Sequence, residues 1–246
     1  VNDACALAVE YENGDIVDTV TIPLSGEGTY DTDQTDYFTQ VSGQDVDVLF
    51  VVDTSGSMSD EQNNLADNID SFISEAQVWN SNYRMALTTC DVSADLGEFR
   101  GNPRWITPDT PNGFNKFADN VKDLGTGGSG TEEGLEAAYQ ALTMPNIFQA
   151  FDEQGKAIEC TNDSACGDAG CYEDPDPAAN GKKYCGGANW GFLREDASLE
   201  VVIISDEDDQ SPADLGFYID FLKNLKGYAN VDLMHIHSIV GDVPGG

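Results

Sequence analysis

Asp53, Ser55 and Ser57 share one tight turn directly after the apolar run 48–52. The unbroken hydrophobicity of this run predicts a strand buried in a parallel sheet, and open α/β sheets bind ligands at the carboxyl ends of their strands. A carboxylate and two hydroxyls are the hard oxygen ligands that suit Mg²⁺. Because coordination positions would be left over, the turn predicts a metal site that binds something further. The alternative for this motif alone is an ordinary helix cap, in which the two serines satisfy backbone donors.

Two later segments carry oxygen ligands at comparable places. The loop 127–131, which reads Gly-Gly-Ser-Gly-Thr, leads into a helical pattern at 132–142, and the apolar run 201–205 ends at Asp206. Ser129 and Thr131 are both candidates for the hydroxyl ligand of this loop, since Thr131 is the better residue type but is also a good N-cap. The choice between a metal site and a simple cap depends on the resemblance that these three segments carry together.

In this order the three segments resemble the metal-ion-dependent adhesion site of von Willebrand factor A domains, a module also seen in the inserted domains of integrins. The likeness covers residues 45–241. It implies that Ser55 and Ser57 bind Mg²⁺ (or Mn²⁺ or Ca²⁺) directly, with Asp53 and Asp206 binding directly or through water. The same alignment places Ser129 slightly ahead of Thr131. It also implies that a carboxylate of a protein or glycoprotein partner completes the shell of the metal.

The pattern between these loops predicts an α/β fold. Strands alternate with amphipathic helices, which is typical of a doubly wound, mostly parallel sheet flanked by helices, the von Willebrand factor A or Rossmann-like class. The last expected strand is interpreted as buried, and Leu215 as facing the core. The expected strands are 47–52, 83–89, 199–205 and 231–240 with an edge strand within 99–106, and the expected helices start at 59 and cover 114–124, 132–142 and 213–228.

The main domain is expected at 45–246. Before it, residues 1–30 indicate a β-hairpin around Asn13-Gly14-Asp15, a candidate for the end of a preceding β-sandwich, and residues 31–44 indicate a polar linker. The resemblance implies one more strand and helix than the sequence holds before Gly246, and the N-terminal hairpin is a candidate cover for that sheet edge. Because no basic-then-apolar signal peptide is present and the first residues already indicate a strand, the chain is interpreted as an excerpt of a longer or processed protein.

Four cysteines fall within a long excursion between the helix 132–142 and the strand 199–205, at residues 145–197. We expect two disulfides, although sequence leaves all three pairings open, and zinc is the alternative, disfavoured because most of the spacings are wider than those of zinc sites. The excursion should attach at the sheet edge opposite the metal. Cys5 and Cys90 would pair with each other or with residues outside this chain. The four disulfide candidates within the excursion are Cys160, Cys166, Cys171 and Cys185.

The composition favours an extracellular binding domain. With 40% hydrophobic residues the chain can bury a core, so its net charge of −34 belongs to a folded surface. This charge disfavours nucleic acid and anionic lipid as partners. No apolar run is long enough to span a membrane, so direct insertion is not expected. Disulfides are typical of an extracellular or cell-surface location.

Other candidate residues are weaker. His235 and His237 point the same way on a strand interpreted as central and apolar, which favours a structural role, and residues 207–209 are interpreted as a solvated acidic cluster at a helix start. There is no G-x-S-x-G or H-E-x-x-H motif, so the chain is not expected to be an enzyme.

The most favoured function is divalent-cation-dependent adhesion or ligand binding. Segments 191–194 and 205–212 are similar to a bacterial extracellular branch of the family, which implies a secreted or surface protein of bacteria. Two alternatives stay open. One is a metal-dependent phosphoesterase that uses Asp53, and the other is a structural module of a surface fibre, in which the ion only joins three loops.

Overall fold

The computed structural model describes residues 5–13, 16–24, 45–78, 81–167, 169–174 and 179–240, without the side chains of the first two ranges and of parts of 70–78 and 228–229. The chain divides into two compact units, Val1–Gln40 and Val41–Gly246. In the first unit, β1 (Cys5–Asn13) and β2 (Ile16–Leu24) pair as an antiparallel ladder. The linker expected at 31–44 lies outside the described residues.

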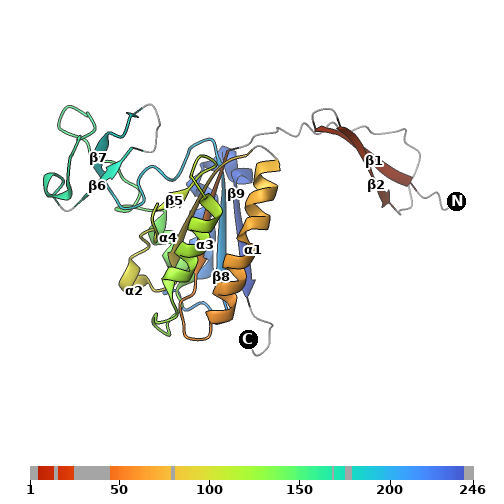
Figure 1. Ribbon diagram of the computed structural model, residues 1–246, viewed down its shortest axis with the longest axis horizontal. Helices are drawn as coiled ribbons and strands as arrows, with labels where there is room; N and C mark the ends of the chain where they lie inside the picture. Colours follow the sequence, from red (N-terminus) through yellow and green to blue (C-terminus); the bar gives the residue numbers. More distant parts are fainter. Residues whose placement is uncertain are drawn as a thin grey trace. The chain divides into compact units, whose positions relative to one another are not determined.

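A mixed, mostly parallel sheet organises the second unit (Figure 1). Its strands lie in the order β5-β4-β3-β8-β9; β4, β3, β8 and β9 run parallel, and β5 pairs with β4 in the antiparallel sense. The prediction of an α/β fold with such a sheet is confirmed. The strand bounds are β3 (Asp45–Val52), β4 (Asn82–Thr89), β5 (Trp105–Ile106), β8 (Ser198–Ser205) and β9 (Met234–Val240).

Helices flank both faces of this sheet because β3 is apolar on both sides. Val48, Phe50 and Val52 of β3 pack toward α1 (Ser59–Val78) and α3 (Gly113–Leu124), where the rings of Phe50 and Phe117 lie 5.1 Å apart. The alternate residues Leu49 and Val51 pack in a second core cluster with α4 (Gly134–Ala141) and α5 (Leu215–Leu225). The short helix α2 (Val92–Asp95) follows β4. No helix of the described residues is long and apolar enough to cross a membrane.

The interpretation of the last strand as buried is wrong. A 3₁₀ helix, η3 (Tyr228–Leu233), occupies the first part of the expected range, and β9 follows it at the end of the sheet order. Residues 235–240 are therefore exposed. β9 has a neighbour on one side only within the described sheet, and its His235 and His237 alternate with apolar residues, unlike the unbroken apolar run of β3. Leu215 is likewise exposed, because it is the first residue of α5.

The excursion between α4 and β8 is fastened to the sheet by Arg194. Its backbone N–H and its Nε donate to the two carboxylate oxygens of Asp47, at 2.8 and 2.7 Å, and its guanidinium pairs with Asp45 at 3.0 Å. Asp47 is completely buried near the start of β3. Since Asp53 follows the other end of β3, the excursion returns to the sheet at the end opposite Asp53.

Candidate metal centre

Asp53 is held rigidly at the tip of β3. Its backbone N–H donates to the carbonyl of Ile204 at 2.9 Å, which extends the pairing of β3 with β8 by one residue. One carboxylate oxygen accepts the backbone N–H of Ser55 at 2.6 Å, and the other accepts the hydroxyl of Ser205 at 2.6 Å. The side chain is fully buried. The hydrogen bonds of Asp53 therefore hold the turn at Ser55 in place and connect it to β8 through Ser205.

Ser55, Ser57 and Asp206 bring their oxygens together in front of Asp53. The hydroxyl oxygens of Ser55 and Ser57 lie 3.1 Å apart, and Ser57 donates to a carboxylate oxygen of Asp206 at 3.1 Å. Ser57 is exposed and Asp206 is half-buried, so this group opens to solvent. Four of the six predicted ligands thus gather where the loops after β3 and β8 meet.

Ser129 and Thr131 are not brought into this group. The backbone N–H of Ser129 donates to Asp91 at 3.0 Å, its hydroxyl donates to the carbonyl of Thr131 at 3.1 Å, and Thr131 is exposed. Within the described residues, neither hydroxyl has a hydrogen bond to the four gathered ligands. Their loop nevertheless lies against the first loop, because the N–H of Gly128 donates to the carbonyl of Thr54 at 2.9 Å. A side chain at position 128 would collide with Thr54.

Glu132 is the site residue that sequence reasoning missed. Its side chain is buried, and neither carboxylate oxygen has a hydrogen-bond partner among the described residues. Burial, followed by the negative charge of Asp53, raises the pKa of Glu132 to about 8. The sequence pattern assigned this residue to the helix 132–142. Since α4 begins at Gly134, Glu132 remains in the loop and can turn inward.

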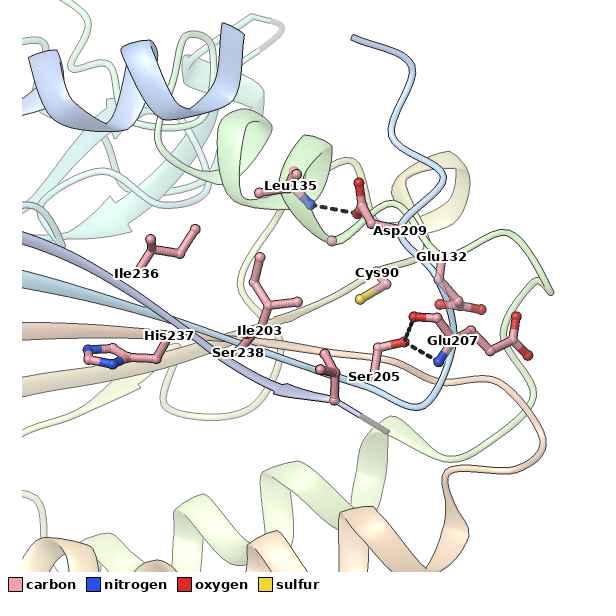
Figure 2. A pocket seen from close by; sticks show the side chains of 12 residues that line it. Cys90, Glu132, Leu135, Ile203, Ser205, Glu207, Asp209, Ile236, His237 and Ser238 are labelled. Atoms are coloured by element: carbon pink, nitrogen blue, oxygen red, sulfur yellow. Dashed lines mark hydrogen bonds between the residues drawn. The ribbon is translucent and has the colours of Figure 1, made fainter. Parts of the chain in front are cut away.

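The loop after β8 fastens the Glu132 loop in turn. The N–H of Gln210 donates to the carbonyl of Glu132 at 2.6 Å, and Asp209 accepts the N–H of Leu135 at 3.1 Å (Figure 2). Ser211 accepts the N–H of Glu136 at 2.9 Å. These contacts satisfy donors in the first turn of α4. Asp209, which sequence reasoning placed in a solvated cluster at a helix start, therefore caps α4 from another loop.

A cavity of about 270 Å³ lies beside the gathered ligands, with Glu132, Ser205 and Glu207 on its wall (Figure 2). Cys90 lies in the same wall and is a buried free thiol. The side chain of Cys5 lies outside the described residues, so the pairing expected for these two cysteines stays a prediction. Burial and the negative charge of Asp53 raise the pKa of Cys90. Cys90 therefore remains protonated, which makes it a poor nucleophile and a poor metal ligand.

The donor set suits a hard divalent cation. All the gathered atoms are hydroxyl or carboxylate oxygens, which is the ligand type of Mg²⁺, Mn²⁺ and Ca²⁺. The buried carboxyl of Glu132, left without a donor, is the kind of group that a nearby cation would compensate. Ser55, Ser57 and Asp206 would hold the ion, with Asp53 behind them.

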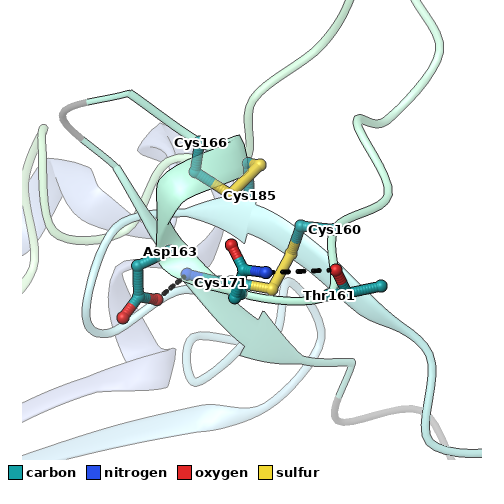
Figure 3. Close-up of a disulfide and its surroundings, with 7 residues drawn as sticks. Cys160, Thr161, Asp163, Cys166, Cys171 and Cys185 are labelled. Atoms are coloured by element: carbon teal, nitrogen blue, oxygen red, sulfur yellow. Dashed lines mark hydrogen bonds between the residues drawn. A yellow bond between two sulfur atoms is a disulfide. The ribbon is translucent and has the colours of Figure 1, made fainter.

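The disulfide candidates lie apart from this centre, in the excursion between α4 and β8 (Figure 3). Cys160 pairs with Cys171 and Cys166 with Cys185, at Cα separations of 5.9 and 5.3 Å. The disulfides tie together the short helix η1 (Asp163–Ala165) and the antiparallel strands β6 (Gly170–Glu173) and β7 (Lys183–Gly186). The structure contains the two expected disulfides, which use all four cysteines of the excursion.

No protein-family model matches the chain, and no curated protein matches it significantly.

Proposed function

We propose that the chain is a divalent-cation-dependent adhesion or ligand-binding domain of the von Willebrand factor A type. In it, Ser55, Ser57 and Asp206 hold Mg²⁺, Mn²⁺ or Ca²⁺, and a carboxylate of a protein or glycoprotein partner completes the shell. The observation that carries the proposal is the contact between Ser57 and Asp206, which joins oxygen ligands from two strand tips at a solvent-exposed point.

This arrangement favours a carboxylate of an acidic partner as the last ligand of the ion, rather than a further group of the protein itself. The carboxylate of Asp53 is occupied by Ser55 and Ser205, so it acts from behind the hydroxyls. Glu132, with its pKa raised to about 8, holds its proton at neutral pH and adds little negative charge before an ion binds. Neutral hydroxyls at the exposed face leave the charge of the ion incompletely compensated. A partner carboxylate would supply that compensation, and exclusion of water would strengthen the contact.

The surroundings of the site favour a secreted or cell-surface setting. Two disulfides cross-link the excursion, and disulfide bonds persist in oxidising compartments. The acidic net charge disfavours nucleic acid as a partner and opposes an acidic ligand at long range. Salt screens this repulsion beyond about 8 Å at physiological ionic strength, so the local cation would dominate the encounter.

Water-proton relaxation with Mn²⁺ bound to the domain tests the proposal. An open coordination position holds exchanging water, which enhances relaxation, and a peptide bearing a glutamate should reduce the enhancement by displacing that water. Ser57→Ala should weaken Mn²⁺ binding, whereas the matched change Ser93→Ala, on α2, should not. Bound Mn²⁺ without water enhancement would favour the structural module, and hydrolysis of a generic phosphoester would favour the phosphoesterase.

Adhesion measurements extend the test to partners. Binding of candidate glycoproteins or cells should vanish with EDTA and return with added Mg²⁺ or Mn²⁺. Binding that survives both EDTA and Asp53→Ala would place the interaction elsewhere on the chain and contradict the proposal.

A further inference from the structure

Both histidines of the chain meet at one carboxylate. The sequence holds two histidines in 246 residues. Nδ1 of His235 lies 2.9 Å from one oxygen of Glu200, and Nε2 of His237 lies 2.8 Å from the other. Two imidazoles and a carboxylate therefore form a compact group that is separate from the oxygen ligands at the strand tips.

The sheet register places these three side chains on one face. Glu200 of β8 is the direct neighbour of His235 in β9, and His237 follows two residues later, so it points the same way. Glu200 is also level with Val48 of β3, which packs toward α1. Because β9 ends the order of the described strands, the imidazoles are accessible, with side-chain exposures of 50% for His235 and 54% for His237. The interpretation of the histidine strand as central is therefore wrong, although apolar side chains do surround the group.

Stability alone gives little reason for this group. Exposed ion pairs contribute about 0–1 kcal/mol, and both pairs here involve half-exposed imidazoles. The same face carries apolar side chains around the group, including Phe50 and Val202, so an apolar residue at position 200 would fit the pattern of the face. Neither ion pairing nor packing therefore accounts for these three polar residues on an apolar face.

We propose that Glu200, His235 and His237 form a second metal site, one for Zn²⁺ or a similar transition ion such as Ni²⁺ or Cu²⁺. Imidazole nitrogen with a carboxylate oxygen suits these ions, whereas Mg²⁺ and Ca²⁺ prefer oxygen ligands throughout. Three protein ligands also leave one position of a tetrahedral zinc shell open, as in catalytic zinc sites. The proposal does not rest on the function assigned to the strand tips.

The three side chains do not yet bring one ligand atom each within 4.8 Å of one another, so ion binding requires a rearrangement of the imidazoles. The imidazole rings lie 6.4 Å apart with their planes at 31°, and each nitrogen contacts a different oxygen of Glu200. An ion would bind where the three side chains meet, once the imidazoles rotate toward a common point. Their exposure leaves them free to do so.

The open position would border an apolar hollow of about 420 Å³. Glu200 and His237 line one side of this hollow, and Leu65, Ile69 and Ile239 line the rest together with other apolar side chains. A small ligand with one metal-binding atom and an apolar group therefore fits the site. The structure thus assigns a ligand class to the open position as well as a metal.

Calorimetry with Zn²⁺ and absorption spectroscopy with Co²⁺ test the site in the intact disulfide-bonded protein, with excess Mg²⁺ present to fill the strand-tip centre. We expect one equivalent of Zn²⁺ to bind and Co²⁺ to show the absorption bands of a site with nitrogen ligands. Loss of a group that merely hydrogen-bonds to a metal ligand lowers metal affinity by about 10–100-fold. We therefore expect at least as large a loss of Zn²⁺ affinity from His237→Ala, and from the double change His235→Ala with His237→Ala. Glu200→Gln should act in the same direction.

Matched variants make the result specific. Asp53→Ala should lose Mn²⁺ but keep Zn²⁺, and Cys90→Ser should keep Zn²⁺, which excludes the free thiol as the ligand. Circular dichroism checks that each variant is folded, and His237→Gln replaces His237→Ala if the latter is not. Absence of Zn²⁺ binding by the wild-type protein, or unchanged binding by the folded double variant, would overturn the proposal.

Discussion

Ser57 donates a hydrogen bond to Asp206 at 3.1 Å, although Ser57 follows β3 and Asp206 follows β8, the next strand in the sheet. Parallel pairing of these strands in register, with Val52 opposite Ile204, brings the two loops to the same edge. The contact is therefore a consequence of the sheet register. It also joins the ligands on which the proposed function depends.

Removal of the Asp206 carboxylate should weaken metal binding. Asp206→Asn keeps the shape of the side chain but removes its charge, and we expect the affinity for Mn²⁺ to fall by at least about tenfold, since even a second-shell partner contributes that much. Titration calorimetry measures the change. Asp208→Asn is the matched control, because Asp208 is an exposed aspartate in the same loop. Equal affinities of the two variants would exclude Asp206 as a ligand.

Glu132 should make the metal-free protein less stable as the pH rises. Its pKa is about 8 in the folded protein and near the usual 4.5 in the unfolded chain, so between these values the folded state binds the extra proton. The free energy of unfolding therefore falls as pH rises through this window. Glu132→Gln is always neutral, so its stability relative to wild type should increase from about pH 5 to about pH 8.

Urea unfolding in EDTA measures this pH dependence. Glu133→Gln, which changes the neighbouring and less buried glutamate, serves as the control. Parallel pH profiles for wild type and Glu132→Gln would show that the buried carboxyl does not hold its proton.

Loss of Arg194 should destabilise the main domain strongly. Arg194→Ala removes the guanidinium and its Nε donor from the buried carboxylate of Asp47 and leaves only the backbone N–H of residue 194. Breaking such a buried pair costs about 3–5 kcal/mol. Lys182→Ala breaks the exposed pair with Glu159 and should cost about 0.2–1 kcal/mol. Urea unfolding at neutral pH compares the two variants. A small effect of Arg194→Ala would mean that water replaces the guanidinium.

Peptide mapping without reduction should find the pairs Cys160–Cys171 and Cys166–Cys185. Disulfides typically contribute about 2–4 kcal/mol, so reduction should increase hydrogen exchange in β6 and β7 before β3 or β8 exchanges. Strands β3 and β8 should keep their protection from exchange, because the contact between Asp47 and Arg194 fixes the end of the excursion to the sheet without the disulfides. A different pairing, or simultaneous exchange of the sheet, would contradict this description.

The sequence alone determined the class of sheet and the position of the candidate ligands at its strand tips. The apolar run before Asp53 has the composition of a strand covered on both faces, and such strands imply a parallel sheet with functional groups at its tips. The D-x-S-x-S turn and Asp206 follow from that argument because they are adjacent to strand ends. Local hydrophobicity and spacing contain this information.

Tertiary packing decided the rest. Sequence could not choose among three cysteine pairings, because only the folded excursion sets which Cα atoms lie within bonding reach. Glu132 turns inward because α4 begins at Gly134 and the loop after β8 fastens it, a relationship between residues far apart in the chain. The prediction of a buried last strand gave little weight to His235 and His237, which alternate with apolar residues. Only the sheet order shows that β9 has a single neighbour among the described strands, because periodicity records which residues are apolar but not which neighbours cover them.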